Sequence, residues 1–141
     1  MAYPSNLFIT VLAAGLLIAI AGLTPLSGQS PSTSVNVGVY SAAQAERGRK
    51  TFESKCTTCH DSARFTGDDF VKQWAGQPLH TLFDLMRTTM PEDNPGSLQA
   101  QQYADVVSYF LQLNEYPAGA DELKGTDELM RALKMEAPKK Q

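Results

Sequence analysis

Both cysteines of this 141-residue chain lie in one pentapeptide, Cys56-Thr57-Thr58-Cys59-His60. The C-x-x-C-H pattern is typical of covalent attachment of a c-type haem. Two intervening residues put both sulfurs on one turn, where each can form a thioether with a haem vinyl group, and the next imidazole can bind the iron. The pattern therefore predicts one haem c per chain, attached to Cys56 and Cys59, with His60 as the proximal iron ligand.

A C-x-x-C pair also occurs in zinc sites and in dithiol oxidoreductases. Zinc would need a second pair of ligands, but His80 is the only other histidine and the sequence has no further cysteine. A thioredoxin-like site would need a βαβ context and would leave His60 unexplained. We therefore favour haem and keep the thiol oxidoreductase as an alternative, which free titratable thiols would reveal.

The sixth iron ligand is expected to be Met90, which lies past a helix in a proline-rich loop and is followed by Pro91. Coordination by His60 and a thioether raises the reduction potential and closes the iron to small ligands. Met86 has helical spacing and is expected in the core. His80 offers a bis-histidine alternative, although it is expected to be solvated near a helix start.

Ser41 followed by Gln44 matches a capping box and predicts a helix over residues 42–55, just before the C-x-x-C-H motif. A glycine inside this helix costs about 1 kcal/mol relative to alanine, so Gly48 indicates that another helix approaches closely there. The residues expected to face inward are Ala45, Gly48 and Phe52.

Three further helices are expected, and no segment alternates convincingly at period two. Pro78 precedes a pattern with helical spacing at Leu79, Leu82, Phe83 and Met86. An amphipathic helix over about 98–113 carries Tyr103, Val106, Val107 and Phe110 on one face, with Tyr109 beside it. A short last helix starts at Thr126, whose hydroxyl can cap it.

A haem would supply the apolar body that so small a domain lacks. The residues expected to form its walls are Phe65, Leu79, Leu82, Phe83, Val107 and Leu111. Trp74 and Arg87 are candidate partners of the propionates. A backbone carbonyl in the 76–78 turn is the expected acceptor for the Nδ1 proton of His60.

The chain begins with an uncharged apolar stretch over residues 7–26, and its first charged side chain is Glu46. This stretch predicts a signal peptide or a membrane anchor within residues 1–28, rather than a buried helix, and we favour cleavage. Residues 29–40 are rich in Ser, Gly and Pro and are expected to be a linker. The folded domain is expected over 41–116, followed by an extension over 117–141 that packs Leu129 and Leu133 on the domain.

The formal net charge of −3 argues against a nucleic-acid partner, which would require a basic face. An export signal agrees with haem attachment outside the inner membrane. The expected location is the periplasm, with the protein either soluble after cleavage or anchored to the inner membrane through residues 7–26.

The chain resembles a class I c-type cytochrome, and three features carry the resemblance: CTTCH at 56–60, Met90-Pro91 and the aromatic final helix. This resemblance implies an all-α cytochrome c fold, three to five helices around one haem, in which Gly48 and Phe52 cross the last helix at Val106 and Tyr109. More narrowly, the segments 38–48, 89–98 and 103–119 and the tail are similar to small cytochromes associated with quinoprotein dehydrogenases. The chain differs from these small cytochromes at two places: it has Gln99-Ala100 where they often have Ser-Pro, and Asp61 where they often have Gly.

These observations predict an exported monohaem electron carrier rather than an enzyme, acting as a monomer. The expected partners are a dehydrogenase as donor, which the resemblance suggests is a quinoprotein, and an oxidase or other terminal acceptor. Because the chain is mildly acidic, any electrostatic steering is expected to come from a basic patch on the partner. The alternative is a haem enzyme or gas-binding sensor in which the sixth ligand is displaceable.

Overall fold

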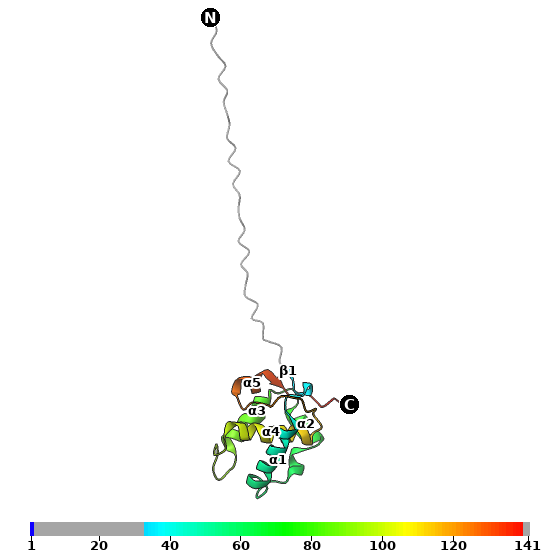
Figure 1. The fold of residues 1–141 in the computed structure, drawn as a ribbon, viewed down its shortest axis with the longest axis vertical. Helices are drawn as coiled ribbons and strands as arrows, with labels where there is room; N and C mark the ends of the chain where they lie inside the picture. The colour runs from blue at the N-terminus through cyan, green and yellow to red at the C-terminus, as the bar shows by residue number, and fades with distance from the viewer. Residues whose placement is uncertain (2–32, 140–141) are drawn as a thin grey trace.

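The computed structural model describes Met1 and residues 33–139, so the expected signal or anchor segment lies outside the described residues (Figure 1). The described part is mostly helical, as expected, and none of its helices is long and apolar enough to cross a membrane. Its elements are β1 (Thr33–Ser34), η1 (Val35–Val37), α1 (Ala42–Lys55), η2 (Ser62–Phe65), α2 (Asp68–Trp74), α3 (Leu79–Thr89), α4 (Ala100–Leu113), α5 (Asp127–Ala132) and β2 (Leu133–Lys134).

The core is built on the crossing of α1 and α4, which are packed directly on each other (Figure 1). Gly48 is buried at this crossing, and a Cβ atom there would overlap the backbone carbonyl of Asp105 and lie 2.9 Å from the backbone nitrogen of Val106. One turn further along α1, the ring of Phe52 lies 5.8 Å from that of Tyr109. The expected close approach at Gly48 is therefore confirmed, because only a hydrogen fits between the two backbones.

The capping box expected at the start of α1 is only half formed. The Ser41 hydroxyl accepts a hydrogen bond from the backbone N–H of Gln44 at 3.1 Å, as predicted. The Gln44 side chain turns inward instead of back to the cap, and its Nε2 donates to Asp105 Oδ1 at 2.9 Å and to the Leu123 carbonyl at 2.7 Å. Its Oε1 accepts from the backbone N–H of Leu123 at 2.7 Å. A buried side-chain amide needs hydrogen-bond partners, and here Asp105 and Leu123 supply them in place of the backbone at the start of the helix.

Helices α3, α4 and α5 lie where the sequence predicts them. Although Gln99-Ala100 replaces the Ser-Pro that is common in similar proteins, α4 still begins there, and Oε1 of Gln102 accepts a hydrogen bond from the backbone N–H of Gln99 at 3.0 Å. The Thr126 hydroxyl accepts from the backbone N–H of Leu129 and caps α5. The elements that were not predicted include the 3-10 turn η2 and the seven-residue helix α2, because both are too short to show helical periodicity. The 3-10 turn η1 and the two-residue strands β1 and β2 were not predicted either.

Residues 33–40, expected to be the end of a linker, pack on the domain instead. Val35 is fully buried, and β1 pairs in parallel with β2 from the C-terminal tail. The buried Tyr40 hydroxyl donates to the Tyr116 carbonyl at 2.7 Å. Composition suggested a linker here, but one valine and one tyrosine with buried contacts are enough to attach the segment to the fold.

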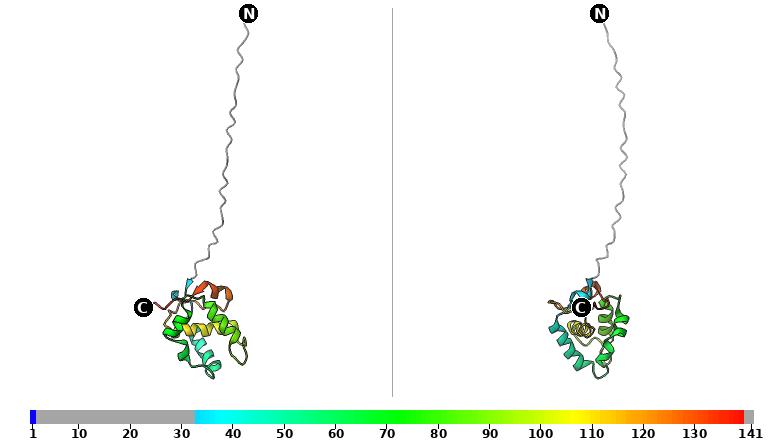
Figure 2. Two further views of the ribbon diagram at one scale, coloured as in Figure 1. Left: turned by 180° about the vertical axis from the view of Figure 1, so that it is seen from behind. Right: turned by 90° about the vertical axis from the view of Figure 1, so that its right-hand side faces the viewer.

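The C-terminal extension also packs on the domain, as the sequence predicts. Leu133 is buried and Leu129 is partly buried against the same core. Met135 pairs with the turn before α3, donating its N–H to the Gln77 carbonyl at 2.9 Å and accepting from the Gly76 N–H at 2.7 Å. Figure 2 shows α5 beside β1 at one end of the domain, where residues 33–34 pair with residues 133–134 of the C-terminal tail.

We predict that Gly48→Ala lowers the free energy of unfolding by about 2 kcal/mol or more, because the added methyl group overlaps the Asp105 carbonyl and forces the two helices apart. Urea unfolding of the haem-loaded protein measures this change. The control is Ala43→Gly at an exposed position of the same helix, which tests helix propensity alone and should cost about 1 kcal/mol. A Gly48→Ala protein as stable as the unmodified chain would contradict the close crossing.

We predict that Met130→Ala costs about 2–5 kcal/mol, because Met130 is fully buried in the C-terminal extension and its loss leaves a cavity. The neighbouring Arg131→Ala, at an exposed position, should change stability by less than about 0.5 kcal/mol. The same unfolding measurement compares the two variants. Equal stabilities would mean that the extension does not share the core of the domain.

Candidate functional site

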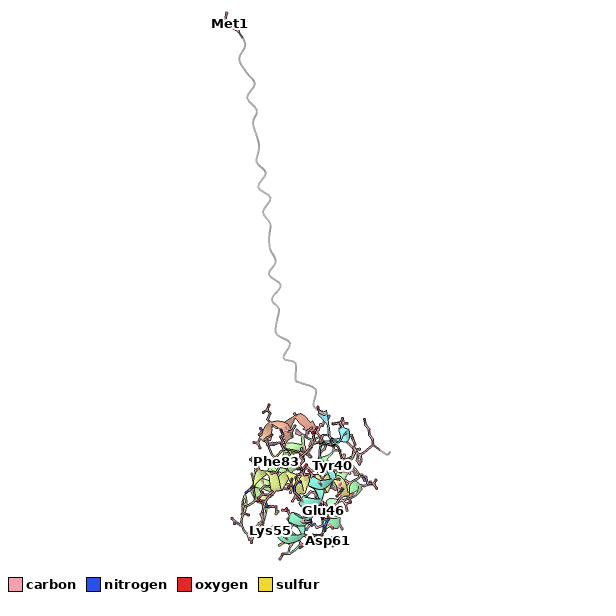
Figure 3. The ribbon with its side chains drawn as sticks, viewed as in Figure 1. Met1, Tyr40, Glu46, Lys55, Asp61 and Phe83 are labelled. Atoms are coloured by element: carbon pink, nitrogen blue, oxygen red, sulfur yellow. The ribbon has the colours of Figure 1, made fainter. Side chains whose placement is uncertain are left out.

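A cavity of about 670 Å³ lies between the end of α1, the segment that follows it, α2, α3 and α4. Its lining includes the four residues that are expected to attach the haem or bind its iron, Cys56, Cys59, His60 and Met90. Figure 3 labels Lys55 and Asp61, which flank the C-x-x-C-H motif, at the end of the domain opposite to β1 and α5. Residues more than thirty positions apart in the sequence are therefore brought to one cavity.

The C-x-x-C-H motif forms a single turn that continues from α1. The backbone N–H of Cys56 donates to the Phe52 carbonyl at 2.8 Å and ends the helix. The Cys56 carbonyl in turn accepts from the N–H of Cys59 at 3.1 Å and of His60 at 2.9 Å. Cys56 is half-buried, which raises the pKa of its thiol, whereas Cys59 is exposed. The two thiols and the imidazole are thus presented by one turn, as the spacing predicts.

The imidazole of His60 lies edge-to-face with the ring of Phe65, with centroids 5.5 Å apart. Its Nδ1 is buried and has no hydrogen-bond partner among the described residues. The expected acceptor in the 76–78 turn is therefore wrong for this structure. The turn is engaged elsewhere, because the Gln77 carbonyl accepts from Met135 and the Pro78 carbonyl accepts from Thr81.

Phe65 is held in place by the end of α4. Its ring stacks on that of Phe110 with centroids 4.4 Å apart and planes 5° from parallel. The buried Asn114 side chain donates to the Phe65 carbonyl at 2.8 Å and accepts from the Gly67 N–H at 2.9 Å. Asn114 thus ties the segment after the motif to α4. Sequence reasoning missed this residue, and a polar residue just after an apolar helix was the only signal for it.

The walls of the cavity are mainly apolar and include several aromatic side chains. Of the six expected wall residues, Phe65 and Leu82 line the cavity, and Leu79, Phe83, Val107 and Leu111 are buried in the core elsewhere. Helix α4 is buried nearly all round, so periodicity alone does not tell which face meets the cavity. The lining residues missed include Phe52, Phe70, Leu85, Met86, Val106 and Phe110.

The two candidate propionate partners differ in position. Trp74 lines the cavity. Arg87 does not belong to its lining, because its guanidinium bonds Asp84 at 2.8 Å and lies 5.6 Å from the ring centroid of Phe83. The hydrogen bond to Arg87 lowers the pKa of Asp84. Arg87 thus belongs to the surface of α3 rather than to the cavity.

Met90 lines the cavity and lies at the end of α3. Its backbone N–H donates to the Met86 carbonyl at 2.9 Å, and its carbonyl accepts from the Tyr103 hydroxyl at 2.6 Å. His80, the alternative ligand, does not line the cavity. Its ring lies toward α5 with Nε2 3.7 Å from Asp127 Oδ1, and it is half-buried rather than solvated. The arrangement does not support a bis-histidine site.

The residues at this cavity fit a haem. The volume lies in the range of about 300–1,000 Å³ that is usual for cofactor sites, and the walls are apolar and aromatic. The donor set consists of one imidazole and one thioether, both of which bind haem iron, together with two thiols able to form thioethers with the vinyl groups. Within the described part, no group of three or more His, Cys, Asp or Glu side chains could hold a metal ion by itself.

Residues 43–110 match the family model described as "Cytochrome C oxidase, cbb3-type, subunit III", which covers just under half of the chain. No curated protein and no solved structure matches the chain. The matched segment is a cytochrome c domain, and its helices agree with the expected cytochrome c fold. A domain of this family is an electron carrier rather than an enzyme, and its single Cys56/Cys59 pair corresponds to one covalent haem c.

We predict that Asn114→Ala lowers the free energy of unfolding of the haem-loaded protein by about 2 kcal/mol, because it removes the hydrogen bonds that this buried side chain makes to backbone groups. Urea unfolding followed by visible absorbance measures the change. Asn94→Ala is the control, since Asn94 is exposed and its side chain makes no hydrogen bond within the described residues. If both variants unfold alike, Asn114 does not hold the segment after the motif.

Proposed function

We propose that this cytochrome c domain belongs to an exported one-electron carrier in which Cys56 and Cys59 attach the haem, and His60 and Met90 are its axial ligands. The observation that carries the proposal is the convergence of these four residues on one apolar cavity. When bound, the haem supplies reversible one-electron chemistry, with iron cycling between Fe(II) and Fe(III).

The protein's own residues perform three tasks in this proposal. The turn over residues 56–60 holds the attachment points on the end of a rigid helix. His60 and Met90 would both bind the haem iron, which would leave no coordination site for a substrate or a gas molecule. The apolar part of the lining, which includes Phe65 stacked on Phe110, would shield the haem from water. Such a site transfers electrons without bond-making to a substrate.

The proposed partners are redox proteins, as the family implies. The matched family is named after a subunit of a cbb3-type oxidase, which supports an oxidase as the acceptor. A dehydrogenase, with a quinoprotein as the first candidate, is the proposed donor on the strength of the sequence resemblance. These contacts are small and transient, and the carrier itself is a monomer.

The proposed location is the periplasm, which is typical of this family. Residues 1–28 serve as a signal peptide or an anchor, and intact mass of the native protein decides between the two. We keep the division into a domain over 41–116 and an extension over 117–141, with the extension as an integral part of the packing. The burial of Leu123, Met130 and Met135 supports the statement that the extension is part of the packed domain.

We predict that the haem stays bound through denaturation, and that the ferric protein shows the weak red band of methionine-to-iron coordination. Met90→Ala should abolish this band, lower the reduction potential and allow carbon monoxide to bind the reduced protein at neutral pH, because the thioether raises the potential and closes the iron. Visible spectra and a redox titration measure these changes.

The control is Met86→Ala, because Met86 also lines the cavity and is half-buried but is not proposed as a ligand. It should keep the red band. A covalent haem with no band in the unmodified protein would contradict Met90 as the ligand. Rapid carbon monoxide binding to the unmodified protein would favour the sensor or enzyme alternative, and free titratable thiols with no bound haem would favour the thiol oxidoreductase.

A further inference from the structure

We infer that Tyr103 is a positioning residue for Met90, and that its hydroxyl holds the ligand loop closed over the cavity. This inference rests on the proposed role of Met90 as an axial ligand. Tyr103 lies on α4, is only 1% exposed, and does not line the cavity itself. Its hydroxyl donates to the backbone carbonyl of Met90 at 2.6 Å.

The loop after Met90 has little else to hold it. Residues 92–97 are all exposed, and their backbone hydrogen bonds stay within the segment 90–97. Among the described residues, Tyr103 is the one residue outside α3 and this loop that hydrogen-bonds to the segment 90–97. A second donor to the Met90 carbonyl, the Gly96 N–H at 3.4 Å, comes from the loop itself. The attachment of the loop to the core by hydrogen bonding therefore depends on a single phenol.

A buried phenol needs a hydrogen-bond partner, and here the partner belongs to the residue proposed as the ligand. When the loop opens and Met90 leaves the cavity, this bond is lost and the hydroxyl is left in an apolar core. The bond is thus made only in the closed state, and an interaction made in one state alone shifts the population toward that state. Removing the hydroxyl should raise the fraction of open molecules without altering either ligand.

We test this with imidazole added to the ferric haem-loaded protein, because an external ligand binds only when Met90 has left the iron. The apparent dissociation constant is the intrinsic constant divided by the fraction of open molecules. Tyr103→Phe should bind imidazole about 3- to 10-fold more tightly than the unmodified protein, as expected from loss of one buried hydrogen bond.

Tyr40→Phe is the matched control. Tyr40 is also 1% exposed, its hydroxyl donates to a backbone carbonyl at 2.7 Å, and it does not line the cavity. Both variants should lose a similar amount of global stability, but only Tyr103→Phe should gain affinity for imidazole. Equal imidazole affinities in the two variants and the unmodified protein would overturn the inference.

Met90→Ala separates this inference from the proposed function. If Met90→Ala tightens imidazole binding and Tyr103→Phe does not, Met90 remains the ligand and the role of Tyr103 is wrong. If Met90→Ala has no effect, the axial assignment fails and the inference fails with it. A second measurement needs no variant: the Tyr103 hydroxyl proton in the unmodified reduced protein should exchange with water as slowly as that of Tyr40. Rapid exchange would overturn the inference even if Tyr103→Phe does not mature.

Discussion

The close crossing of α1 and α4 at Gly48 is the constraint on which the rest of the structure depends. With no side chain at this position, the backbone of α1 packs directly on the Asp105 carbonyl. The crossing fixes the position of α1 relative to α4, and therefore the position of the turn that follows α1 and carries the two cysteines and His60. It also brings Phe52 against Phe110, with ring centroids 5.7 Å apart, so that one contact between helices positions both the attachment motif and a wall of the cavity.

The polar groups buried beside this crossing reinforce it. The Asp105 carboxylate accepts from Gln44 on α1, from Gln101 on its own helix and from Arg47 at 3.2 Å. Gln44 also exchanges two hydrogen bonds with the backbone of Leu123. A buried carboxylate is costly unless its lone pairs are satisfied, so this network ties the C-terminal extension to the same place at which the two helices meet.

Two side chains of α4 and its end control the two sides of the cavity. Asn114 donates a hydrogen bond to the Phe65 carbonyl, in the segment that follows His60. Tyr103 donates a hydrogen bond to the carbonyl of Met90, the second proposed iron ligand. Helix α4 is thus the rigid element from which both ligand segments are held, while the ligands themselves lie on a turn and a loop. This arrangement suits an electron carrier, because a site held rigidly from one helix changes little when the charge on the iron changes.

Much of this protein is determined by local sequence alone. The C-x-x-C-H motif carries its own chemistry, and the caps and apolar spacing of α1, α3, α4 and α5 depend only on neighbours within a few residues. The glycine at position 48 likewise indicated a close partner helix before that helix could be placed.

What only the tertiary structure decided is which partner each side chain meets across long sequence separations. Val106 and Phe110 face the cavity while Val107 and Leu111 do not, and on a helix buried nearly all round no periodicity distinguishes them. The Gln44 side chain bonds Asp105 instead of capping its own helix. The Gln77 carbonyl accepts a hydrogen bond from Met135 rather than from His60, and Val35 is buried in the core. In each case a buried group contacts a residue far away in the sequence. Which distant residues come together depends on the packing of the whole domain and cannot be read from neighbouring residues.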